Sequence, residues 1–380
     1  MHSSVKNNSM TKPKKIFISL YALFAFATLV FILFIYNQPP NISPYNEDSN
    51  YDQQFIHGEI EEINYESEEE SQFTVSANSG TEKGEMLTVT SSSLNNYNVY
   101  ELGDEILIYK GINTNTGEIN YEVSDYYHQN GLLYIFIVFA VITIAIARKK
   151  GVTSILSIII SLSLFYFIFL KMVALGYSPI SACLIFVLLV TILTIPLIHG
   201  FNKKSLSAII AILIGYIISI YISFLFKDLA QLGTAPSEDF RMLGVVYPQI
   251  ELSDILIASL FMGAIGALID TAISIASAIF EAIKEHANQT FSKVYKIGMA
   301  VGKDVLGSMI NTLLFAYLAS VLPFLVLISL DRGSTLSGLL NMDFIALELT
   351  RTFIGAISLV ILIPIVASIS AYLFTRFKKI

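Results

Sequence analysis

Long apolar runs separated by short polar connections dominate the sequence. Runs of 18 or more apolar residues are typical of membrane-spanning helices, because about 20 such residues cross the hydrocarbon layer of a bilayer. The pattern predicts eight spans, at roughly residues 16–36, 131–147, 152–170, 178–198, 206–226, 253–277, 305–329 and 345–373. We therefore expect an all-α polytopic membrane helix bundle.

A soluble stretch, residues 41–130, interrupts the apolar pattern after the first run. Short segments with β character alternate there with glycine-containing turns. The predicted strands are 55–63, 72–77, 86–90, 105–109 and 120–123. Five strands without a helical pattern predict a small all-β domain, an OB-like barrel.

These patterns divide the chain into three parts. Residues 1–36 form an N-terminus and a first transmembrane helix, residues 41–130 the β domain, and residues 131–380 a seven-helix domain with a polar core at 253–323. The first run is longer than the apolar region of a signal peptide and lacks a small-residue cleavage site. We expect an uncleaved anchor, and a cleaved signal peptide is the alternative.

Charge is distributed unevenly along the chain. Residues 37–130 hold 18 acidic and 2 basic residues, whereas the rest of the chain is net basic. The basic clusters fall on one side of the predicted bundle, at 12–15, 148–150, 203–204, 284–303 and 376–379. Because positive loops stay in the cytoplasm, we expect both termini inside and residues 37–130 outside. An acidic barrel also excludes nucleic acid as a partner.

Two consecutive predicted helices each carry a polar face. Asp270, Ser274 and Ser277 share one face, and Asp304, Ser308 and Asn311 share a face on the next helix. Carboxylate, hydroxyl and amide oxygens in a row fit an ion or substrate path, and we expect the two faces to meet. The alternative is hydrogen bonding between helices, with Asp304 capping a helix N-terminus.

Other ionisable residues and motifs say less about function. Glu348 and Arg351 are three residues apart on the last helix, so we expect a structural ion pair. Cys183 is the single cysteine and lies in an apolar run. The sequence has no phosphate-binding loop, no H-E-x-x-H and no G-x-S-x-G motif, so we predict no enzyme activity, no metal site and no cofactor.

The polar core has a recognisable sequence. The segments GAIGALIDTAISIASAIFE and GMAVGKDVLGSMINTLLFAYLASVLP, the turn HGFNKKS at 199–205, and Glu-x-x-Arg in the last helix resemble the YibE/F family of multi-pass bacterial membrane proteins. The resemblance implies a helix bundle in the bacterial plasma membrane, with no assigned chemistry.

Two functions fit these observations. The first is a secondary transporter or permease that uses the polar intramembrane site. The alternative is a non-transporting scaffold or sensor whose β domain binds an envelope protein at residues 41–130. In both cases the bilayer is a partner, and the sequence leaves the oligomeric state open.

Overall fold

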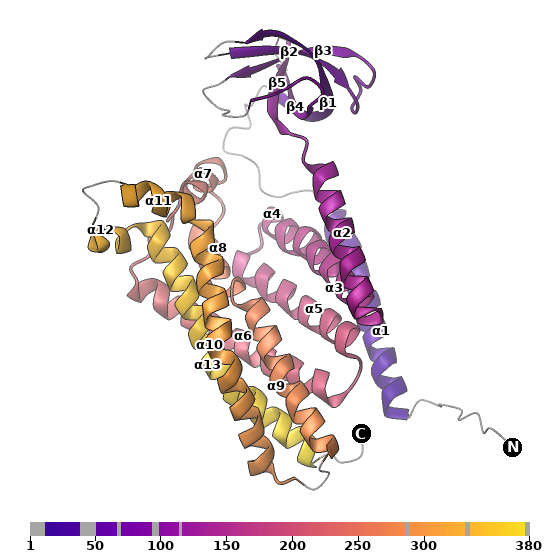
Figure 1. Ribbon diagram of the computed structural model, residues 1–380, viewed down its shortest axis with the longest axis vertical. Coiled ribbons are helices and arrows are strands. Elements are labelled where there is room, and N and C mark those ends of the chain that lie inside the picture. Colours follow the sequence, from indigo (N-terminus) through magenta and orange to yellow (C-terminus); the bar gives the residue numbers. More distant parts are fainter. Residues whose placement is uncertain are drawn as a thin grey trace, which may run out of the picture. The chain divides into compact units, whose positions relative to one another are not determined.

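The protein is described by a computed structural model that covers residues 12–38, 51–66, 70–92, 99–113, 116–285, 289–330 and 335–376. The chain separates into two compact units, one of residues 46–151 and one of residues 1–45 and 152–380 (Figure 1). The predicted cytoplasmic N-terminus and the basic C-terminal residues 377–380 lie outside the described residues.

The five predicted strands are present and form a closed barrel. They are β1 (Tyr51–Glu66), β2 (Glu70–Ala77), β3 (Met86–Ser92), β4 (Glu105–Asn113) and β5 (Ile119–Tyr126). The order around the barrel is β1-β2-β3-β5-β4, with antiparallel pairs except for the parallel pair of β3 with β5. Strand β4 lies beside β1, which is the Greek-key return expected of an OB-like barrel.

The barrel has a core of its own. Alternating residues of its strands, such as Ile56, Ile60, Ile106 and Ile108, are buried. A charged pair also lies inside: Lys110 of β4 donates to the carboxylate of Glu82, and both side chains are buried. The sequence pattern gave no sign of this pair, since Glu82 lies in a turn rich in charged residues.

The other elements are helices. They are α1 (Lys12–Tyr36), α2 (Gln129–Ala147), α3 (Lys149–Leu164), α4 (Lys171–Ala174), α5 (Pro179–His199), α6 (Lys203–Leu229), α7 (Glu238–Val246), α8 (Leu252–Met262), α9 (Ile265–Glu285), α10 (Phe291–Ser320), α11 (Leu322–Leu330), α12 (Leu336–Leu340) and α13 (Asp343–Arg376). A π-helical segment, η1 (Phe165–Leu170), joins α3 to α4. Helix α2 belongs to the unit that contains the barrel.

Six helical stretches of the described chain are long and apolar enough to cross a membrane, or seven if the bent pair α10–α11 is one span. In α1 the apolar part Leu23–Tyr36 is shorter than this. The count of eight crossings therefore stays a prediction, while the multi-pass character of the chain follows directly from these helices.

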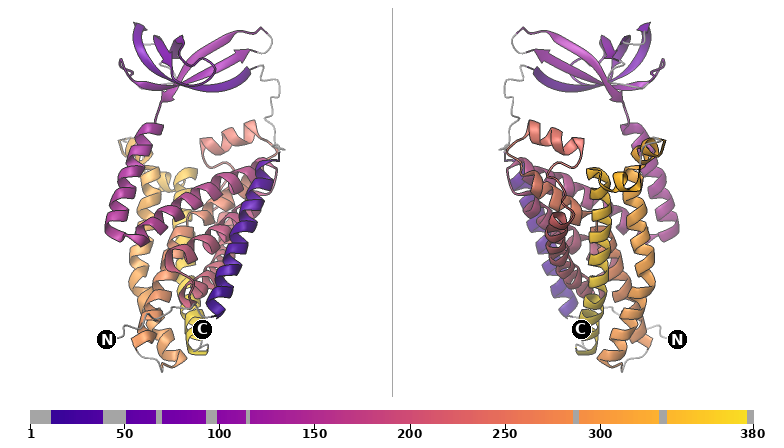
Figure 2. Two further views of the ribbon diagram at one scale, coloured as in Figure 1. Left: turned by 90° about the vertical axis from the view of Figure 1, so that its right-hand side faces the viewer. Right: turned by 90° about the vertical axis from the view of Figure 1, so that its left-hand side faces the viewer.

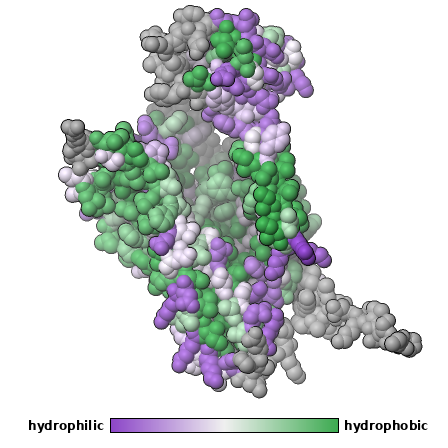
Figure 3. All heavy atoms as spheres, in the orientation of Figure 1, coloured by the Kyte–Doolittle hydropathy of each residue, from purple (hydrophilic) through white to green (hydrophobic). Residues whose placement is uncertain are grey.

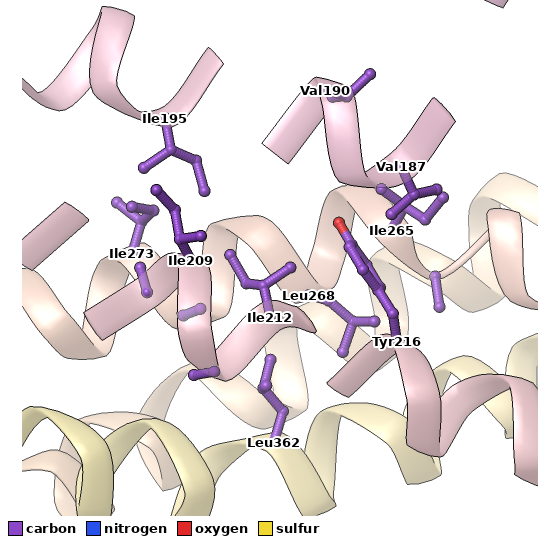
Figure 4. Packing of buried hydrophobic residues seen from close by; sticks show 14 of the residues in the cluster. Val187, Val190, Ile195, Ile209, Ile212, Tyr216, Ile265, Leu268, Ile273 and Leu362 are labelled. Carbon is purple, nitrogen blue, oxygen red and sulfur yellow. The ribbon is translucent and has the colours of Figure 1, made fainter. Parts of the chain in front are cut away.

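Apolar side chains at helical spacing hold the larger unit together. Residues from α5, α6, α9 and α13, among them Val187, Ile212, Leu268 and Leu362, are buried against one another (Figure 4). Glycines let the helices approach: a Cβ on Gly215 of α6 would come within 2.9 Å of the Leu362 side chain. Close contact through small residues is the usual basis of helix association in lipid.

The segment 281–323 differs from its prediction. The apolar pattern predicted a span at 305–329, but α10 runs without a break from Phe291 to Ser320. It then bends by 66° into α11. Pro323 is the second residue of α11, where proline is accommodated because no intrahelical hydrogen bond needs its nitrogen.

Candidate functional site

The polar face of α9 lies on the outside of the bundle of a single chain. Asp270 is exposed, and Ser274 and Ser277 are half-buried. The opposite face of the same helix is fully buried, as Leu268 and Ala272 show. This arrangement follows from the sequence, because the apolar positions of α9 face the core and leave the polar positions outside.

Asp270 also lies deep along its span. It is the 19th of the 33 residues from Leu252 to Lys284, about 27 Å from the first along the helix axis. In the described part of the chain no hydrogen bond or ion pair reaches its carboxylate. A carboxylate at the centre of a lipid-facing helix costs about 2.5–3.5 kcal/mol on insertion scales, so Asp270 needs water or another polar surface.

The polar face of α10 is exposed in the same way. Asp304, Ser308 and Asn311 are all exposed, as are Lys303 and Gly307. The opposite side of α10 is buried at Gly298, Gly302 and Leu313. In Figure 3 purple and pale residues interrupt the green surface over the middle and lower part of α10.

Contacts to α13 fix the depth of this face. A Cβ on Gly302 would meet Ile363, and a Cβ on Gly298 would meet Ala367. Ile363 is the 21st of the 34 residues of α13, so Asp304 lies near the middle of the bundle. Figures 1 and 2 both show α10 and α13 side by side. Asp304 is also the 14th of the 30 residues of α10, and the expectation that it caps a helix N-terminus is wrong.

The two polar faces do not meet within one chain. Helix α9 contacts α10 through Ile275 and Ile279, which lie against Gly302 and Gly298. These residues are roughly opposite the aspartates on each helix, at about 100° per residue. The expectation of a shared polar path between α9 and α10 is therefore wrong for the single chain, because both helices turn their apolar faces toward α13 and toward each other.

A hollow of about 550 Å³ opens along the first half of α10. The predicted topology places this half of the helix on the cytoplasmic side. The residues that line the hollow all come from this helix, and they are Tyr295, Lys296, Met299, Ala300, Lys303 and Asp304. A hollow lined by one helix is an open surface, so a ligand there would need a second wall. Asp304 and two lysines give this surface both signs of charge.

The predicted pair of Glu348 and Arg351 is formed, and it has further partners. Arg351 Nη1 donates to both carboxylate oxygens of Glu348 at 2.7 Å, and Nη2 donates to Ser259 Oγ at 3.3 Å. The guanidinium lies 5.4 Å from the ring centre of Tyr317. Both charged side chains are largely buried, so the pair is a structural link between α13, α8 and α10.

A helix break lies beside this pair and was not predicted. Gly263 separates α8 from α9, and a Cβ there would come within 2.1 Å of the Tyr317 hydroxyl. Any side chain at this position would require Tyr317 or Arg351 to move. Sequence reasoning missed Ser259 and Tyr317 as partners of Arg351, because they come from other helices and nothing in the local pattern links them to the last helix.

The fold and these faces define a polytopic membrane protein with ionisable residues at the depth of its spans. A family profile described as YibE/F-like protein matches residues 135–376, which is more than half of the chain. The chain therefore belongs to the YibE/F-like family, as its core segments indicated. Neither curated proteins nor solved structures gave a match.

Proposed function

We propose that this protein is a secondary permease for protons or small cations in the bacterial plasma membrane. Both termini lie in the cytoplasm and the acidic barrel lies outside, according to the distribution of basic residues. In this proposal Asp270 and Asp304 carry the ion or proton. Ser274, Ser277, Ser308 and Asn311 supply neighbouring oxygen atoms one or two helical turns away.

The observation that carries the proposal is the position of Asp270. Its carboxylate is unpaired among the described residues, lies near the middle of a 33-residue span, and is followed on the same face by two hydroxyl side chains. A carboxylate used only for helix packing would be buried against a neighbouring helix. An unpaired carboxylate at this depth, once water or another polar surface covers it, suits reversible binding of a cation or proton.

The test is ion movement in liposomes that contain the purified full chain. With an imposed pH or cation gradient, the wild-type protein should collapse the gradient, and Asp270→Asn should abolish this activity while leaving membrane insertion intact. Asp228→Asn is the matched control, because Asp228 is exposed at the end of α6, away from the path. Failure of wild-type vesicles to move any proton or cation would falsify the proposal.

A second function is favoured by the surface of the barrel. Several apolar side chains there are more than half exposed, including Phe55, Val99 and Leu102 at 58%, 72% and 64%. Exposed apolar side chains on a strongly acidic domain suit an envelope protein that presents an apolar patch with basic residues around it. Residues 41–130 used as bait should then retain such a protein from an envelope extract, and an empty pull-down would count against this function.

A further inference from the structure

We propose that two copies of this chain associate in the membrane through the exposed polar face of α10. This face is defined by Lys303, Asp304, Gly307, Ser308, Asn311, Thr312 and Phe315. The inference rests on the proposed function in one respect: the second copy supplies the missing wall of the ion path along Asp304, Ser308 and Asn311.

The depth of the face requires a polar or protein cover. Gly302 against Ile363 and Gly298 against Ala367 place Lys303 and Asp304 at mid-bundle. Lipid tails offer no hydrogen bonds, so a helix face with two charges and an amide is unstable against them. The apolar part of α2, residues 132–147, lacks the polar groups that such a cover needs. Tyr134 and Thr143 are the polar side chains in it.

The chemistry of the face fits a second copy. Two chains inserted in the same direction are related by a two-fold axis along the membrane normal, so each residue meets residues of its own depth. Asn311 both donates and accepts hydrogen bonds, and therefore pairs with itself. The adjacent Lys303 and Asp304 provide both signs of charge at one depth, so the lysine of one copy can neutralise the aspartate of the other.

The shape of the face permits close approach. A Cβ on Gly307 would meet no atom within 4 Å, so the space in front of it is open. Phe315 is 67% exposed one turn beyond Asn311 and provides an apolar anchor on the same face. The hollow lined by Lys296, Ala300 and Asp304 continues this face toward the lysine-rich end, and a second copy would close it.

Disulfide formation in native membranes tests the association on the full-length protein. The native Cys183 is buried and is first replaced by Cys183→Ala. Ser308→Cys, Asn311→Cys and Phe315→Cys should each give, after mild oxidation, a covalent species of twice the 42.1 kDa chain mass. Ile217→Cys is the matched control, since Ile217 is 67% exposed on α6 and should give none.

A second measurement separates specific association from collision. Asn311→Leu should lower the yield of the Ser308→Cys dimer about threefold, because the self-pairing amide is lost. No dimer at any of the three positions, or equal yields at Ile217→Cys, would overturn the inference. A cross-linked species that contains a different protein would also overturn it.

The cross-linking result does not depend on transport. A dimer that forms along α10 in a protein without ion flux would remove the permease proposal and leave the association intact. Ion flux by a protein that never cross-links through α10 would keep the permease proposal and remove the association.

Discussion

Gly302 of α10 lies directly against Ile363 of α13, so that a Cβ on the glycine would come within 2.3 Å of Ile363 Cγ2. The branched side chain cannot move aside easily, and Ile275 Cδ1 of α9 lies 3.2 Å from the same point. This contact brings three helices together at one depth. It also fixes the depth of Asp304, which is exposed on the surface of the bundle two residues further along α10.

The first prediction concerns this contact. Gly302→Ala should destabilise the protein by about 1–3 kcal/mol through overpacking, which exceeds the gain of up to about 1 kcal/mol in helix propensity. Heating in detergent with a thiol-reactive dye measures the effect, because buried Cys183 reacts on unfolding. Gly266→Ala, where a Cβ would meet no atom within 4 Å, should not lower the transition temperature.

The second prediction concerns the buried ion pair. Arg351→Gln alone should cost about 3–5 kcal/mol, because it leaves the carboxylate of Glu348 buried without its charged partner. Combining it with Glu348→Gln should recover much of this loss. Thermal unfolding of the two single variants and the double variant gives the coupling energy, and strictly additive losses would contradict the pairing.

The third prediction concerns the pH dependence of the barrel. The Lys110 ammonium beside Glu82 holds the pKa of that carboxyl below its usual range, against burial, which acts in the opposite direction. A folded-state pKa below the unfolded one means that the stabilisation is present above the unfolded pKa, about 4.3 for glutamate, and is lost as the pH falls through the folded pKa.

Urea unfolding of residues 46–130, followed by circular dichroism at pH 7, 5 and 3, measures this dependence. The fragment contains the complete barrel with its own core. Glu82→Gln should lower stability at pH 7 and flatten the change between pH 5 and 3. Glu85→Gln, at an exposed position in the same turn, should behave like the natural sequence.

The fourth prediction concerns orientation. In a Cys183→Ala background, Thr116→Cys in the barrel should react with a membrane-impermeant thiol reagent in intact cells, and Ser292→Cys at the start of α10 should react only after lysis. Both positions are exposed, so accessibility within the protein is matched. Labelling in the reverse pattern would place the basic connections outside and contradict the charge argument.

Much of the fold was predictable from local patterns. The apolar runs predicted the long helices, and alternation with glycine turns predicted all five strands of the barrel. The path of α10 was not predictable in the same way. The apolar run predicted a span that begins near residue 305, whereas the helix already begins at Phe291 and packs against α13 through Gly298 and Gly302. The partners of Arg351 were also hidden, because Ser259 and Tyr317 come from helices far apart in the sequence.

The sequence by itself determined which residues share a helix face, because the 3.6-residue period places Asp270 with Ser274 and Asp304 with Ser308. Only the tertiary structure decided what those faces meet. Helices α9 and α10 bury their apolar sides against α13, and this turns both aspartates outward. The physical reason is that periodicity fixes directions around one helix axis, whereas the orientation of that axis depends on contacts between distant segments, such as Gly302 with Ile363.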